Sequence, residues 1–279
     1  MTLSEMRRVL DERGIQLTKS LGQNFLHDGN QLRRIVAAAE LAPTDRVLEI
    51  GPGLGPLTEQ LIAVAGEVFA VEKDARLVAL LQERFREQPK LRLLHGDGLE
   101  IVRTDASNWD GWKLVANLPY SVASPILVEL ASNAHPPARM TATLQLEVAR
   151  RLMAKAGGDD YGLLTLLVQL RYEPRGLFRI PSGCFFPPPD VESACITLVK
   201  RERDLLPIAI HPIFVRVVKR AFSQRRKMML KLLKQEWPAE ALEAAMARLE
   251  LSTQIRAEAV TLEQFVELTK LLTSGDASA

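Results

Sequence analysis

The chain has 279 residues, 47% of them hydrophobic and 25% charged, and a net charge of +2, which suits a globular protein with one large and one small domain. No apolar run approaches the roughly 20 residues that span a bilayer, and residues 1–13 lack a signal peptide's apolar core, so we expect a cytoplasmic protein. The two cysteines and four histidines exclude a disulfide framework and show no metal-ligand spacing, so we expect no metal.

The first chemically informative stretch follows a helix predicted over about 28–39, for which Asp28 is a suitable N-cap. A short apolar strand over 46–50 runs directly into three alternating glycines, Gly51, Gly53 and Gly55. Glycine permits positive φ angles and leaves no Cβ to block a ligand, and the helix that follows presents free N–H groups. This stretch predicts the binding site of a nucleotide-like cofactor.

Strands and helices continue to alternate, which indicates a mostly parallel, doubly wound, Rossmann-like α/β sheet. Further strands are expected at 67–72, 91–95, 113–116 and 142–146. Two extended pieces at 176–180 and 194–200 should add a hairpin at one edge of the sheet. Only helical patterns follow residue 203, so we expect a first domain over 1–204 and a small all-helical domain over 205–279.

Four successive expected strands end at a glycine or a polar residue, namely Gly51, Glu72, Asp97 and Asn117. Ligands bind at this edge of an open parallel sheet. A carboxylate at Glu72 can accept hydrogen bonds from both hydroxyls of a ribose, and one at Asp97 can accept from the exocyclic amine of adenine. Taken alone, they could be a surface glutamate and a turn aspartate; their shared position favours the functional interpretation.

The spacing of the glycines distinguishes between two cofactors. A nicotinamide-dinucleotide turn reads Gly-x-Gly-x-x-Gly, whereas this turn has Pro56 where the third glycine should stand. The pattern therefore favours S-adenosylmethionine over NAD, and an NAD-dependent dehydrogenase is a distant alternative.

The segment Asn117-Leu118-Pro119-Tyr120 predicts the chemistry. Proline directly after a strand fixes φ and removes a donor, so that the preceding carbonyl is held in place. The Asn117 amide oxygen and the Leu118 carbonyl then offer two acceptors to one amine, and Tyr120 offers a face on which a flipped base can stack. This combination suits a planar ring with an exocyclic amine better than it suits an ordinary strand-to-loop transition.

Basic residues gather in one part of the chain. Residues 211–236 carry eight basic side chains and a single acidic one, whereas 237–279 carry seven acidic and three basic ones. A basic surplus at helical spacing is typical of a phosphate-binding face, although a merely solvated helix surface would look the same.

Five segments together resemble the family of rRNA adenine N6-dimethyltransferases, and within it the bacterial small-subunit branch. They are Lys19–Leu26, Glu49–Gly55, Asn117–Tyr120, Phe185–Ser193 and Ala221–Lys227. The resemblance extends from about residue 15 to 271 and implies a class I S-adenosylmethionine-dependent methyltransferase fold. It also implies the substrate, which is two adjacent adenines in a hairpin near the 3′ end of 16S rRNA, each methylated twice within a pre-30S subunit.

The resemblance implies roles for individual residues as well. The implied cofactor-binding residues are Asn24, Leu26, Gly51, Gly53, Glu72, Asp97, Gly98 and Asn117. The implied catalytic residues are Asn117 and Leu118, which grip the target N6, and Tyr120 and Phe185, which form the walls of the base pocket. The implied RNA contacts are Arg220, Arg225, Arg226 and Lys227.

Two departures and two alternatives accompany this resemblance. Asp190 stands where the family usually has lysine, which puts one expected RNA contact in doubt, and Lys231 stands where asparagine is common.

A resistance-type methyltransferase acting on 23S rRNA would use the same chemistry on another target. A checkpoint in small-subunit assembly, in which binding matters more than catalysis, is the other alternative. We expect a monomer in either case.

Overall fold

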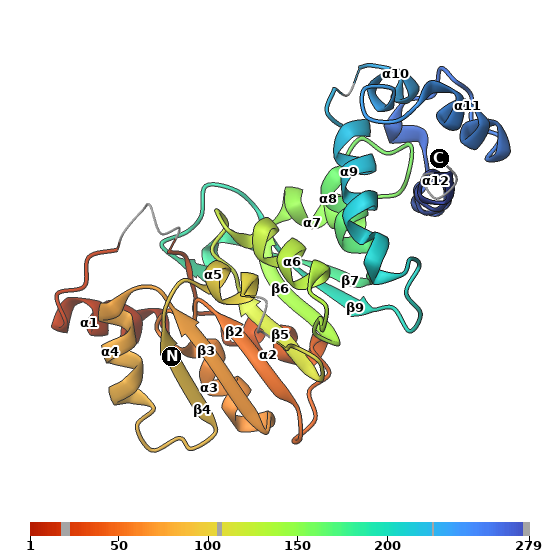
Figure 1. The fold of residues 1–279 in the computed structure, drawn as a ribbon. Helices are drawn as coiled ribbons and strands as arrows, with labels where there is room; N and C mark the ends of the chain where they lie inside the picture. Colours follow the sequence, from red (N-terminus) through yellow and green to blue (C-terminus); the bar gives the residue numbers. More distant parts are fainter. Residues whose placement is uncertain (18–22, 105–107, 225, 276–279) are drawn as a thin grey trace. The chain divides into compact units, whose positions relative to one another are not determined.

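The computed structural model describes residues 1–17, 23–104, 108–224 and 226–275 (Figure 1). The chain divides into two compact units. The first consists of Met1–Ala149 and Glu173–Lys200, and the second of Arg150–Tyr172 and Arg201–Ala279.

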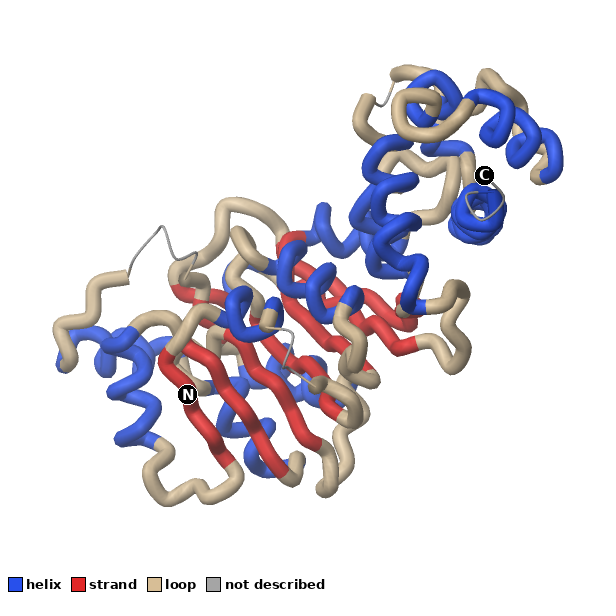
Figure 2. Tube along the Cα trace, viewed as in Figure 1, coloured by secondary structure: helices blue, strands red, loops and turns tan. Residues whose placement is uncertain are grey.

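The first unit is built on a seven-stranded sheet with the strand order β4-β3-β2-β5-β6-β9-β7 (Figures 1 and 2). The strands are β2 (Arg46–Ile50), β3 (Glu67–Glu72), β4 (Leu91–His95), β5 (Trp112–Asn117), β6 (Arg139–Gln145), β7 (Tyr172–Ile180) and β9 (Ser193–Lys200). The pairs β2–β3, β2–β5, β3–β4 and β5–β6 are parallel, whereas β9 runs antiparallel to β6. The predicted Rossmann-like sheet is therefore confirmed, with β9 and β7 at the edge where the hairpin was expected.

Helices cover both faces of this sheet. They are α1 (Leu3–Glu12), α2 (Gly29–Ala38), α3 (Pro56–Val64), α4 (Ala75–Arg84), α5 (Gly98–Arg103) and α6 (Ala123–Ser132), and α7 (Leu146–Met153) carries the chain into the second unit. Helices α2, α3 and α4 share one buried apolar cluster with β3, which includes Ile35, Leu61, Val68 and Leu81. Helices α5 and α6 pack together over the opposite face (Figure 1).

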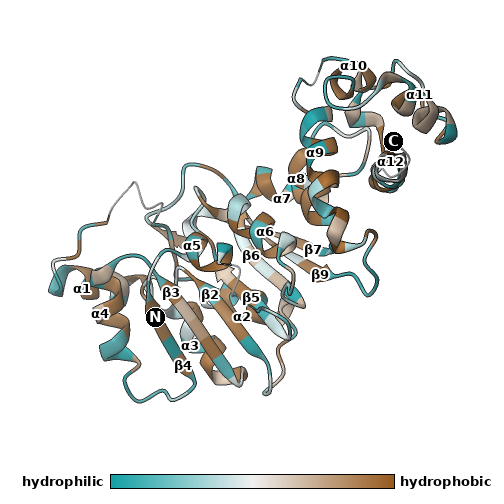
Figure 3. Cartoon of the chain, viewed as in Figure 1, coloured by the Kyte–Doolittle hydropathy of each residue, from teal (hydrophilic) through white to brown (hydrophobic). Residues whose placement is uncertain are grey.

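Sequence features account for these elements. The β3 residues from Val68 to Val71 are all buried, as expected of a parallel strand covered on both faces, and Figure 3 shows apolar residues along the central strands. Asp28 caps α2 by accepting hydrogen bonds from the N–H groups of Asn30 and Gln31, both at 2.9 Å. The predicted start of this helix is thus confirmed.

A short ladder that the sequence patterns did not predict joins β1 (Phe25–Leu26) to β8 (Phe185–Phe186). The two strands are antiparallel, with Phe25 opposite Phe186 and Leu26 opposite Phe185. Two of the recognised segments, far apart in the sequence, are therefore neighbours in the first unit.

The second unit is helical and has its own core. Its helices are α8 (Leu163–Gln169), α9 (His211–Ala221), α10 (Met229–Leu233), α11 (Ala239–Arg248) and α12 (Leu262–Gly275). Segment 150–172, which we had assigned to the first domain, packs in this unit, because Tyr161, Leu166 and Leu170 are buried in the same cluster as Phe214 and Phe265. No helix of the described ranges is long and apolar enough to cross a bilayer.

Candidate active site

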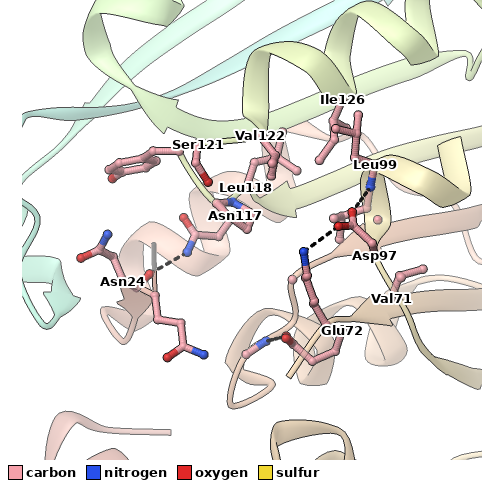
Figure 4. A pocket seen from close by; sticks show the side chains of 18 of the residues that line it. Asn24, Val71, Glu72, Asp97, Leu99, Asn117, Leu118, Ser121, Val122 and Ile126 are labelled. Carbon is pink, nitrogen blue, oxygen red and sulfur yellow. Dashed lines mark hydrogen bonds and ion pairs between the residues drawn. The ribbon is translucent and has the colours of Figure 1, made fainter. Parts of the chain in front are cut away.

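A cleft lies at the carboxyl ends of β2, β3, β4 and β5, the edge at which open parallel sheets bind their ligands. All four strand-end residues singled out above line it, namely Gly51, Glu72, Asp97 and Asn117. Figure 4 shows the last three of them together. The sheet topology thus gathers into one cleft side chains that are dispersed along the sequence.

The glycine turn forms the floor of the cleft. Gly51 and Gly53 have φ angles of +71° and +61°, which residues with a Cβ rarely adopt. A Cβ on Gly53 would also come within 2.6 Å of the Phe25 ring. Glycine is needed here for both reasons, since the turn lies directly against an aromatic ring of β1.

Glu72 is held in place by the backbone around it. One carboxylate oxygen accepts a hydrogen bond from the Gly53 N–H at 3.0 Å (Figure 4), and the other accepts from the Asp74 N–H at 2.9 Å. Burial raises the pKa of Glu72, and these backbone donors oppose the shift. Each oxygen keeps a lone pair for a further donor, such as a hydroxyl of a ribose.

Asp97 has both a structural role and a place in the cleft. Its Oδ1 accepts from the Leu99 N–H at 2.8 Å and caps α5, and its Oδ2 pairs with the Lys73 ammonium at 2.8 Å. The lysine lowers the pKa of Asp97 against the effect of partial burial, so the carboxylate is charged and can accept from an amine. Gly98 lets α5 start close to the sheet, because a Cβ there would lie 2.4 Å from Ile50.

The Asn117 amide is fixed at one end and unsatisfied at the other. Its Nδ2 donates to the Asn24 carbonyl at 2.9 Å (Figure 4). Its Oδ1 is buried and has no hydrogen-bond partner among the residues that the structure describes. Buried polar atoms nearly always have a partner, so we expect a bound ligand to supply the hydrogen-bond donor for this oxygen. Beside it, the Leu118 N–H donates to the Thr143 carbonyl at 3.0 Å and anchors the loop to β6.

Two expected site residues are buried in the apolar core and do not line the cleft. Phe185 and Leu26 are each only 2% exposed and belong to the apolar cluster that α2 and α3 share. Neither residue lines the cleft, although Leu26 borders a smaller cavity that it shares with Asn117. The structure therefore places Phe185 in the core, and Tyr120 lines the cleft as expected.

Glu49 on β2 is a buried acid that we had assigned no role. It is 1% exposed and borders the same smaller cavity, and its Oε2 has no hydrogen-bond partner within the described ranges. Burial raises the pKa of Glu49 to about 8; the nearby Thr58 hydroxyl opposes this shift and the Glu72 carboxylate adds to it. The sequence signal for this buried acid was a lone carboxylate among the apolar residues 47–50 of β2.

The basic segment of the second unit is partly engaged in internal ion pairs. Arg220 donates to the Leu232 carbonyl at 3.1 Å and lies 3.7 Å from Glu236, so its guanidinium is held within the protein. Arg226 and Lys227 are exposed. Arg225 lies outside the described residues. Among the described residues, no group of three or more His, Cys, Asp or Glu side chains could hold a metal ion.

Comparisons with known proteins point to one family. Residues 14–274 match the family model described as Ribosomal RNA adenine dimethylase. A protein of Moorella thermoacetica named Ribosomal RNA small subunit methyltransferase A is 38% identical over 94% of both chains. A protein of the same name from Geobacter metallireducens is also 38% identical, over 93% of this chain and 96% of its own.

Two solved structures resemble the fold. The crystal structure of the 23S rRNA methyltransferase ErmE has a TM-score of 0.69 at 29% identity, and the match covers 90% of this chain and 100% of that one. A dimethyladenosine transferase from Plasmodium falciparum has a TM-score of 0.75 at 23% identity, covering 88% of this chain and 95% of its own.

The buried acid Glu49 generates a prediction about stability. A carboxyl whose pKa rises on folding from 4.5 to about 8 takes up a proton on folding between these values. Its stabilising contribution is therefore complete below pH 4.5 and is lost as the pH rises through about 8. We expect Glu49→Gln to flatten the fall in melting temperature between about pH 5 and about pH 8.

Thermal denaturation of the wild type and Glu49→Gln over this pH range measures the effect. Glu67→Gln, at the start of the adjacent strand β3, is the control and should keep the wild-type slope. An unchanged slope in Glu49→Gln would show that Glu49 is ionised in the folded protein throughout this range.

Proposed function

The chain belongs to the ribosomal RNA adenine dimethylase family, and we propose that it transfers methyl groups from S-adenosylmethionine to N6 of two adjacent adenines near the 3′ end of 16S rRNA. Each adenine receives two methyl groups. The observation that carries the proposal is the buried Oδ1 of Asn117, which lacks a partner among the described residues and belongs to a residue that lines the cleft at the carboxyl edge of the sheet.

The cleft suits S-adenosylmethionine as the methyl donor. The Glu72 carboxylate, oriented by two backbone N–H groups, has lone pairs for the ribose hydroxyls. The Asp97 carboxylate can accept a hydrogen bond from the adenine amine of the cofactor. Asn24 borders the same cleft on the side of Asn117, where it can contact the methionine end. When bound there, S-adenosylmethionine supplies an electrophilic methyl group.

Asn117 and Leu118 make the target amine nucleophilic. The lone pair of an adenine amine is delocalised into the ring, so attack requires that it be released and aimed at the methyl group. The Asn117 Oδ1 and the Leu118 carbonyl can accept hydrogen bonds from the N–H groups of the amine. These bonds favour tetrahedral geometry at nitrogen and stabilise its developing positive charge. Holding the nitrogen about 3–3.5 Å from the methyl carbon removes much of the remaining entropic barrier. We assign no general base, and the proton leaves after the transfer.

The relatives support the small-subunit target over the large-subunit one. Proteins named for the small subunit share 38% identity with this chain over more than nine-tenths of its length. The 23S rRNA methyltransferase ErmE shares 29%. We therefore propose 16S rRNA within a pre-30S subunit as the substrate, bound in the cytoplasm by a monomer.

The second unit supplies the RNA contacts in this proposal. Arg226 and Lys227 are exposed between α9 and α10, where they can pair with phosphates and give an affinity that falls with salt. Arg220 supports the α9–α10 pair through Leu232, and Arg225 belongs to the same basic run.

Replacing Asn117 tests the catalytic assignment. Asn117→Ala removes the acceptor for the target amine, so the methylation rate should fall at least about 100-fold while S-adenosylmethionine still binds nearly as tightly as to the wild type. Methyl transfer to 16S rRNA and calorimetry of cofactor binding measure the two effects. Asn108→Ala, at an exposed turn, is the control, and near-wild-type turnover of Asn117→Ala would refute the assignment.

Replacing Glu72 tests the cofactor assignment. Glu72→Gln keeps the volume but turns one oxygen into an NH2 group that faces a backbone N–H donor, so S-adenosylmethionine should bind at least about tenfold more weakly. Calorimetry on this variant and on Glu67→Gln, the control at the start of β3, measures the loss. An unchanged affinity would remove Glu72 from the cofactor site.

Reversing charges tests the RNA-binding assignment. Arg226→Glu with Lys227→Glu should weaken 16S rRNA binding and lower the slope of log K against log salt concentration, with cofactor affinity unchanged. Arg8→Glu with Arg86→Glu makes the same change in charge at exposed positions of the first unit and should have little effect. If both pairs behave alike, the basic segment is only a solvated surface.

A further inference from the structure

Tyr120 is attached to the sheet through its hydroxyl. The ring lines the cleft three residues after Asn117, and its Oη shares a hydrogen bond with the Oγ of Ser193. Burial raises the pKa of Tyr120 and the Ser193 hydrogen bond opposes the shift, so the phenol is neutral under ordinary conditions. Neither the sequence motifs nor the related proteins indicated a role for Ser193.

Ser193 is a rigid point of attachment. It is fully buried, and it is the first residue of β9, where it lies opposite Gln145 of β6. The backbone on both sides is also paired, since the Leu146 N–H donates to the Glu192 carbonyl at 2.8 Å. The backbone that carries the serine hydroxyl is thus fixed by the β6–β9 pair.

The same strand pair also anchors the loop that carries Tyr120. The Leu118 N–H donates to the Thr143 carbonyl of β6 at 3.0 Å, and the Val122 N–H donates to the Pro119 carbonyl at 3.1 Å and closes the turn. These bonds fix the backbone of the loop but leave the tyrosine ring free to rotate about its side-chain bonds. The hydroxyl lies at the far end of the ring, so a hydrogen bond there restrains both side-chain torsions together.

We infer that Ser193 is a positioning residue, and this inference rests on the proposed function. Ser193 holds the Tyr120 ring in the orientation that stacks on the target adenine beside Asn117. Stacking contributes only when the ring lies parallel to the base, and a ring ordered in advance loses less entropy when the base enters. Ser193 itself does not touch the reacting atoms.

Four variants test this role. Ser193→Ala and Tyr120→Phe both remove the hydrogen bond, and each should lower kcat/KM for 16S rRNA about fivefold without changing the affinity for S-adenosylmethionine. The double variant should be no worse than Tyr120→Phe alone, because the serine acts through the tyrosine hydroxyl. Ser193→Thr keeps the hydroxyl and should restore most of the activity.

Cys195→Ala is the matched control, since Cys195 is buried on β9 two residues after Ser193. It should change the melting temperature without changing kcat/KM. If Ser193→Ala lowers only the melting temperature, or if its kinetic loss adds in full to that of Tyr120→Phe, the positioning role is wrong while the proposed function stands. A wild-type protein that does not methylate 16S rRNA overturns both.

Discussion

The hydrogen bond from the Asn117 amide to the Asn24 carbonyl is the interaction on which the candidate site depends. It engages the nitrogen of the amide with the Asn24 carbonyl and leaves the oxygen of this cleft-lining residue without a partner among the described residues. Because that oxygen is buried and has no partner among the described residues, the folded protein holds an acceptor ready for a donor from outside. The 2.9 Å bond thus links the Asn24 backbone to the geometry of the proposed reaction.

Backbone groups orient the rest of the site. The N–H groups of Gly53 and Asp74 hold Glu72, and the start of α5 holds Asp97. The parallel sheet places the ends of its strands side by side, so residues that belong to different βα units face one cleft. Burial of Glu49 near Glu72 adds an acid whose protonation depends on the fold.

The sequence predicted the central sheet because its signals were local: apolar strands, aspartate caps and a glycine turn. It also predicted that Glu72, Asp97 and Asn117 would meet, since parallel topology alone brings strand ends together. The β1–β8 ladder and the burial of Phe185 were missed, because two-residue strands have no periodicity. The grouping of segment 150–172 with the C-terminal helices depends on long-range packing around Tyr161, which no local pattern encodes.

Mass spectrometry of 16S rRNA provides the most direct test of the central claim. Small subunits lacking adenine dimethylation and, in a separate reaction, 23S rRNA would be incubated with the purified protein and S-adenosylmethionine, and the 3′ fragment of the 16S rRNA and the whole 23S rRNA would then be analysed. The account predicts two methyl groups on each of two adjacent adenines. Methylation of 23S rRNA instead, or no methylation of either RNA, would contradict it.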